Sequence, residues 1–130
     1  MRPYPGIVLF GLLATVTFDA LASVASRALS FWYPYATIGS WPIYATVGLL
    51  AGRAASVRAA AVAGAAVGFV ETTLRWAVSW LIGPGRVGAD TLTVGAVAIT
   101  IVLVTLVGAG IGALGGVAGR RGAGGAARAA

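Results

Sequence analysis

Four long apolar stretches, separated by short turn-forming segments, divide the chain. They cover residues 6–29, 35–52, 59–82 and 92–117. Each reaches or approaches the roughly 20 residues that a helix needs to cross about 30 Å of hydrocarbon. Helices also satisfy their backbone hydrogen bonds internally, as lipid requires. The pattern therefore predicts an all-α polytopic membrane protein with four transmembrane helices, of which the second is the shortest and contains Pro42.

The connections between these stretches are short: residues 33–35 close the first, residues 53–58 form the second, and residues 83–86 end the third span. Short connections favour antiparallel packing of neighbouring helices, so two antiparallel hairpins are expected. Residues 1–118 then form a single four-helix transmembrane domain. The Gly-, Ala- and Arg-rich residues 119–130 are expected to be a disordered tail.

The arginines predict how the helices are oriented. One side of the predicted bundle carries Arg2, Arg53, Arg58, Arg120, Arg121 and Arg128, and the other carries Arg86. Because cytoplasmic loops are enriched in basic residues, both termini should face the cytoplasm. An aromatic cluster at 31–35 then lies at the outer interface, where such residues gather. The abundance of Ala, Gly, Val and Arg and the absence of Lys fit a GC-rich bacterial genome. This composition favours a bacterial inner membrane as the location of the multi-pass protein.

The first stretch has a second interpretation as a cleaved signal peptide. Arg2, the apolar run 7–18 and the small residues 20–25 have the order expected of one. Against cleavage, the small-residue pattern continues to Leu29 and the aromatic cluster follows at membrane-spanning distance. Cleavage would leave three spans.

Composition narrows the possible functions. The chain is 59% hydrophobic and 9% charged, whereas a globular domain carries about 25% charged residues. It contains no Cys, His, Lys, Asn or Gln, so the usual nucleophiles, acid/base groups and metal or haem ligands are missing. We therefore expect no catalytic residues, metal site or cofactor, and no enzyme. The net charge of +6 comes from arginines at the ends of apolar runs, which favours headgroup contact over nucleic-acid binding.

Two acidic residues, Asp19 and Glu71, fall at similar predicted depth near the middle of spans one and three. Each belongs to a polar stripe along one face of its predicted helix. The stripes comprise Thr15, Asp19, Ser23 and Ser26 in the first span, and Gly64, Gly68, Glu71, Arg75 and Ser79 in the third. Since ionisable groups in a bilayer are costly, both stripes should face the bundle interior.

Two interpretations of these charges remain open. In the functional one, Asp19 and Glu71 hold protons or cations on a pathway, with Arg27 and Arg75 as counter-charges. In the structural one, the same four residues form buried ion pairs. Glu71 and Arg75 are spaced for pairing within one helix, and Asp19 could pair with either arginine.

A third pattern concerns glycine. Gly64 and Gly68 make one GxxxG motif, and Gly108, Gly112 and Gly116 repeat that spacing along the fourth span. Such motifs bring helices into close contact. The fourth-span glycines could pack within the bundle or against a second copy, and the second possibility favours a homo-oligomer.

Two functions of different class fit the sequence. The first is an oligomeric transporter or channel-like protein that moves ions or small solutes by way of the mid-membrane carboxylates. The alternative is a non-catalytic accessory or assembly subunit of a larger membrane complex. The partners expected from the sequence are the lipid bilayer together with further copies of the chain or other membrane proteins.

Overall fold

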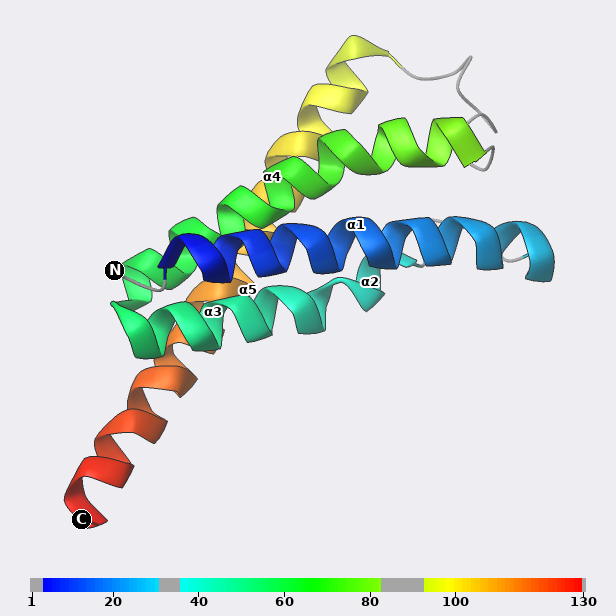
Figure 1. The fold of residues 1–130 in the computed structure, drawn as a ribbon. Coiled ribbons are helices and arrows are strands. Elements are labelled where there is room, and N and C mark those ends of the chain that lie inside the picture. Colours follow the sequence, from blue (N-terminus) through cyan, green and yellow to red (C-terminus); the bar gives the residue numbers. More distant parts are fainter. Residues whose placement is uncertain (1–3, 31–35, 83–92, 130) are drawn as a thin grey trace.

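A computed structural model describes residues 4–30, 36–82 and 93–129, and all the elements in these ranges are helical (Figure 1). The helices are α1 (Tyr4–Leu29), α2 (Ala36–Gly39), α3 (Trp41–Ala54), α4 (Val57–Ile82) and α5 (Val94–Ala129). Three of them, α1, α4 and α5, contain stretches long and apolar enough to cross a membrane. The all-α prediction is confirmed, and three of the four predicted spans have a candidate helix.

The second predicted span differs from expectation because it is broken. Its helix α3 has 14 residues, which cover about 21 Å. The break lies at Ser40, between α2 and α3, and Pro42 sits in the first turn of α3. Proline has no amide hydrogen and its ring clashes with the carbonyl four residues earlier, so a helix continuing from α2 cannot pass through Pro42. The Ser40 carbonyl instead accepts hydrogen bonds from the amides of Ile43 (3.0 Å) and Tyr44 (3.2 Å).

Side-chain caps define where two of the long helices begin. Ser56 Oγ accepts a hydrogen bond from the Ala59 amide at 3.1 Å, and Thr93 Oγ1 accepts one from the Ala96 amide at 3.2 Å. Both hydroxyls satisfy an amide that has no partner within its helix. The starts of α4 and α5 lie two residues from the predicted boundaries at 59 and 92.

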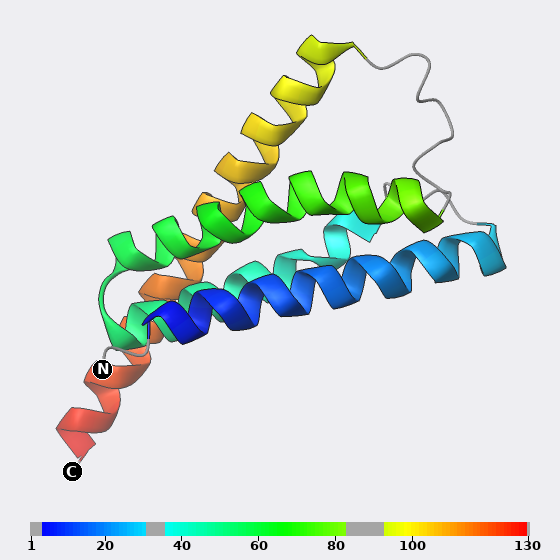
Figure 2. The same cartoon turned by 45° about the horizontal axis from the view of Figure 1, so that its top comes forward.

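The helices are arranged around a central antiparallel pair, α3 and α4. α1 packs on one side of this pair and runs in the same direction as α4, while α5 crosses the pair on the other side (Figures 1 and 2). α1 begins and α5 ends at the same end of the bundle, which also holds the α3–α4 turn. We call this the terminal end, and the end where α1 finishes the distal end.

The C-terminal segment also differs from expectation, because α5 continues as helix to Ala129. Residues 119–130 were expected to form a disordered tail because they are Gly-, Ala- and Arg-rich and have no apolar period. Ala and Arg are among the best helix formers, and extending an existing helix avoids the cost of nucleating a new one. Continuation from α5 is therefore a sufficient physical reason for the helical tail.

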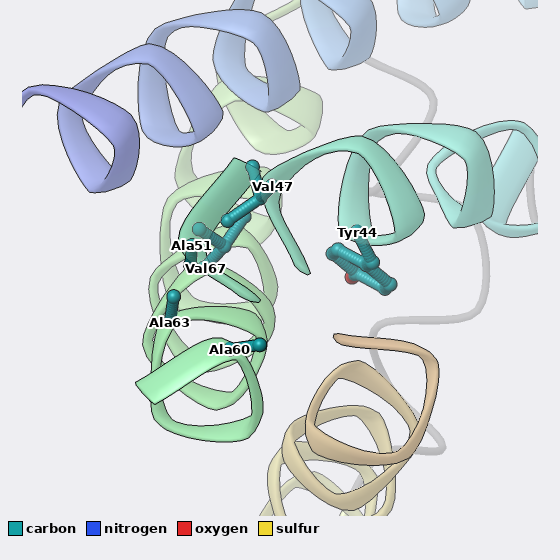
Figure 3. Packing of buried hydrophobic residues seen from close by; sticks show 6 residues of the cluster. All are labelled: Tyr44, Val47, Ala51, Ala60, Ala63 and Val67. Carbon is teal, nitrogen blue, oxygen red and sulfur yellow. The ribbon is translucent and has the colours of Figure 1, made fainter. Parts of the chain in front are cut away.

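The apolar core occupies the terminal half of the bundle. Small side chains dominate it, contributed by α3 and α4 (Figure 3): Tyr44, Val47, Ala51, Ala60, Ala63 and Val67. Half-buried residues near the start of α1 cover this cluster, among them Ile7, Val8 and Leu12. The buried polar residues of α1 lie beyond it, toward the distal end.

Candidate functional site

The polar stripe of α1 faces the bundle interior, as its spacing predicts. Thr15, Asp19, Ser23 and Ser26 are all buried, and Asp19 is 1% exposed. Thr15 donates to its own helix, where the carbonyls of Gly11 and Leu12 lie 3.1 and 3.0 Å from its Oγ1. Ser23 Oγ is buried without a hydrogen-bond partner among the described residues.

Glu71 of α4 is the second buried acid, and it is held by α3. It is 1% exposed. Ser40 Oγ donates to its Oε1 at 2.6 Å, and the Tyr44 hydroxyl donates to its Oε2. Both donors lie in the first turn of α3 or just before it, so the break next to Pro42 places them beside the carboxyl. Each carboxyl oxygen of Glu71 thus accepts a hydrogen bond from a hydroxyl in the first turn of α3 or just before it.

The two acids lie at different depths, which corrects the sequence-based expectation. Gly11 packs against Val67, such that a Cβ at Gly11 would lie 2.9 Å from Val67 Cγ2. Since α1 and α4 run in the same direction, Glu71 is four residues beyond this contact and Asp19 is eight residues beyond Gly11. Asp19 therefore lies about 6 Å closer to the distal end. The difference arises because α1 is shifted along its axis relative to α4. The sequence of either helix alone does not determine this shift.

Of the two arginines predicted near the acids, the structure describes the side chain of Arg27 but not that of Arg75. Arg27 is exposed in the last turn of α1. The side chains of Arg75 and Ser79 lie outside the described part of the chain, although both positions belong to α4. The proposed pairings of Asp19 or Glu71 with Arg75 thus stay predictions.

The glycines singled out from the sequence lie at helix–helix contacts within the chain. A Cβ at Gly108 of α5 would approach the Gly64 carbonyl oxygen of α4 to 2.5 Å, and one at Gly112 would approach that of Ala60 to 2.6 Å. Gly68 and Gly116 also face neighbouring helices. The glycine face of α5 therefore packs inside the bundle, which is one of the two alternatives, and it gives no support to a homo-oligomer.

A second set of packing glycines, on α3, was not predicted. Gly48 and Gly52 of α3 have the GxxxG spacing, and their backbones lie against Gly112 and Gly116 of α5. This motif could have been found by the same spacing rule. The role of Ser40 and Tyr44 as donors to Glu71 was also missed, and no sequence signal pairs them with that residue.

Chemically, the interior offers hydroxyl and carboxyl oxygens. They come from three helices, α1, α3 and α4, and are provided by Thr15, Asp19, Ser23, Ser26, Ser40, Tyr44, Glu71 and Thr72. No group of three or more acidic or imidazole side chains that could hold a metal ion occurs among the described residues. Such oxygens can exchange protons or hold one small cation.

Comparisons of the chain with protein-family models, with curated proteins and with solved structures find no match. The class of protein follows from the candidate spans and from the surface of the helices. Most large apolar side chains of α5 are exposed, including Ile99, Leu106 and Leu114. Apolar residues outside and polar residues inside is the arrangement suited to a lipid solvent. The chain is a small integral membrane protein with three candidate spans.

Proposed function

We propose that the protein moves protons or another small cation across the bilayer, using Asp19 and Glu71 as carrier groups. The observation that carries this proposal is the burial of both carboxyls in a bundle whose outer surface is apolar. An ionisable residue inside a membrane protein is costly, and such residues typically mark ion pathways. Burying two of them, each 1% exposed, costs a chain of 130 residues a large amount of free energy.

The neighbouring hydroxyls support a relay. Ser23 and Ser26 continue the polar stripe from Asp19 toward the distal end, while Ser40 and Tyr44 contact Glu71. A hydroxyl is both donor and acceptor, so it can pass a proton between carboxyls or coordinate a cation through its oxygen. Buried hydroxyls thus lie along the α1 stripe on both sides of Asp19, and a second group contacts Glu71.

The terminal half must open for transport to occur. Val47 and Val67, together with the small residues around them, fill the interior between Glu71 and the terminal end. A proton or cation that enters from the distal end therefore meets an apolar barrier beyond Glu71. We propose that α1 or a second copy of the chain moves to complete the route, so that the carboxyls are exposed to one side at a time.

Flux into sealed vesicles tests the proposal. The purified chain is reconstituted with a pH-sensitive dye inside, and a potassium-diffusion potential drives protons; the same assay is repeated with Na⁺ and K⁺ indicators. Glu71→Gln and Asp19→Asn should each abolish the flux that the unaltered chain supports, because the amide cannot exchange a proton or balance a cation. Thr100→Val is the matched control, since Thr100 is exposed on α5 and its hydroxyl donates to the Ala96 carbonyl of the same helix.

The readout requires folded protein, so each variant is first compared with the unaltered chain by circular dichroism and size-exclusion chromatography. Normal flux in both acid variants would overturn the proposal. Loss of flux in Thr100→Val as well would show that the loss in the acid variants reflects disturbed folding and not the removal of a carboxyl.

A non-catalytic accessory subunit is the second candidate. It is favoured by a specific observation: each carboxyl oxygen of Glu71 accepts a hydrogen bond within the chain, from Ser40 or Tyr44, as expected of a structural polar contact. The particle extracted gently from native membranes separates the two functions. Stoichiometric association with other proteins, together with no flux by the isolated chain, would support the accessory role, whereas an isolated chain or homo-oligomer would support transport.

A further inference from the structure

Arg53 reaches from the end of α3 across the edge of α5. A Cβ at Gly119 would lie 3.2 Å from Arg53 Cγ, and a Cβ at Gly122 would lie 3.5 Å from Arg53 Nη2. The stem of Arg53 therefore runs over two glycines of the neighbouring helix. The side chain remains exposed. Its position in the last turn of α3 is favourable for a cation, because the helix dipole is negative there.

Arg120 and Arg121 add two further cations to the same segment of α5. Both are exposed, and in sequence they lie between the two glycines that Arg53 crosses. The acidic residues in the described part of the chain, Asp19 and Glu71, are buried elsewhere in the bundle. Positive charge therefore gathers at the terminal end without nearby acidic side chains among the described residues.

An exposed apolar strip leads along α5 to this cluster. Val107, Leu114 and Arg121 are spaced seven residues apart, so they share one face of the helix. Val107 is 41% and Leu114 is 72% exposed. A ligand lying on this face would meet two apolar side chains followed by a guanidinium.

We infer that Arg53 and Arg121 form a binding site for the phosphate group of an anionic phospholipid, whose acyl chain lies along Leu114 and Val107. Guanidinium groups present a planar fork of donors that matches phosphate oxygens. The adjacent apolar strip distinguishes a lipid from a free phosphate, which would gain nothing from it. A lipid whose headgroup carries net negative charge is favoured, because no nearby acidic side chain among the described residues neutralises these arginines.

The test titrates the full chain, purified in a neutral detergent, with fluorescent phosphatidylglycerol, and compares it with phosphatidylcholine carrying the same acyl chains. Arg53→Gln and Arg121→Gln should each weaken phosphatidylglycerol binding about tenfold, as expected for loss of a hydrogen bond between charged groups. Arg58→Gln is the matched control, because Arg58 is an exposed arginine at the same end, in the first turn of α4. It should change the affinity about twofold or less.

Gly122→Leu tests the geometry without changing the charge. A larger side chain at this position would displace the Arg53 guanidinium, and it should weaken binding as Arg53→Gln does. Equal losses in Arg53→Gln and Arg58→Gln, or equal affinity for the two lipids, would overturn the inference in favour of diffuse electrostatic attraction. Full displacement of the lipid by millimolar inorganic phosphate would also overturn it, because the site would then recognise the anion alone.

Discussion

The Tyr44 hydroxyl of α3 donates a hydrogen bond to Glu71 Oε2 of α4, and both side chains are 1% exposed. This contact joins the two central helices inside the bundle. Because water is excluded there, the carboxyl depends on protein donors to satisfy it. The contact therefore bears on both the stability of the bundle and the transport proposal.

Replacing Tyr44 by Phe should destabilise the bundle. The change keeps the ring but removes the donor, leaving one oxygen of the buried carboxyl without this partner. Interhelical hydrogen bonds in membranes contribute about 1–2 kcal/mol, and unfolding of the variant in an SDS titration should show a loss of that order. Tyr4→Phe is the control, since Tyr4 bonds a carbonyl at a half-buried position. An equal or greater loss in the control would argue against the importance of the Glu71 contact.

Ser40 and Tyr44 should be energetically coupled through Glu71. They donate to different oxygens of the same carboxyl, and residues within one hydrogen-bond network give non-additive effects. In a double-mutant cycle of Ser40→Ala and Tyr44→Phe, the free energies of unfolding should depart from additivity by about 0.5 kcal/mol or more. Strict additivity would mean that the two hydroxyls act independently.

Gly112→Leu should prevent α5 from docking. A Cβ at this position already approaches the Ala60 carbonyl oxygen to 2.6 Å, so a leucine would force α5 away from α3 and α4. The expected result is loss of the folded bundle, measured as a broadened size-exclusion profile and a lower unfolding midpoint. Gly110→Leu is the matched control, because nothing lies within 4 Å of a Cβ there. Normal folding of Gly112→Leu would contradict the close contact and return this glycine to a role in association.

Cysteine labelling should determine whether α3 crosses the bilayer. The chain contains no cysteine, so single cysteines can be placed at Ser30 beyond α1, Ala55 in the α3–α4 turn and Ala123 near the end of α5. If all four long elements cross, Ala55→Cys and Ala123→Cys should react with an impermeant maleimide from one side of sealed membranes. Ser30→Cys should react from the other.

The informative position is Ala55, because α3 has 14 residues and is the shortest of these elements. Labelling of Ala55→Cys from the same side as Ser30→Cys would show that α3 does not span the bilayer. Labelling after detergent disruption provides the control for the reactivity of each cysteine.

Much of the architecture follows from local sequence. The apolar runs predicted α1, α4 and α5 because spanning length and hydropathy are properties of one segment. The spacing of Thr15, Asp19 and Ser23 identified the buried face of α1 for the same reason, since helical periodicity fixes which residues share a face. The glycine spacing likewise identified the surfaces of close contact, but it left open whether they pack within the chain or between copies.

Relationships between helices were decided by tertiary structure. The partners of Glu71, the different depths of Asp19 and Glu71, and the position of Arg53 over Gly119 all depend on how far one helix is shifted along another. That shift is set by packing between helices, at Gly11 where α1 contacts Val67 of α4, and at Gly48, Gly64 and Gly112 where α5 contacts α3 and α4. The sequence by itself determined that α1, α4 and α5 are apolar helices and which face of α1 is polar, because length, hydropathy and helical periodicity are local properties. Only the packed bundle decided which residues meet, because interhelical contact depends on side chains distant in sequence.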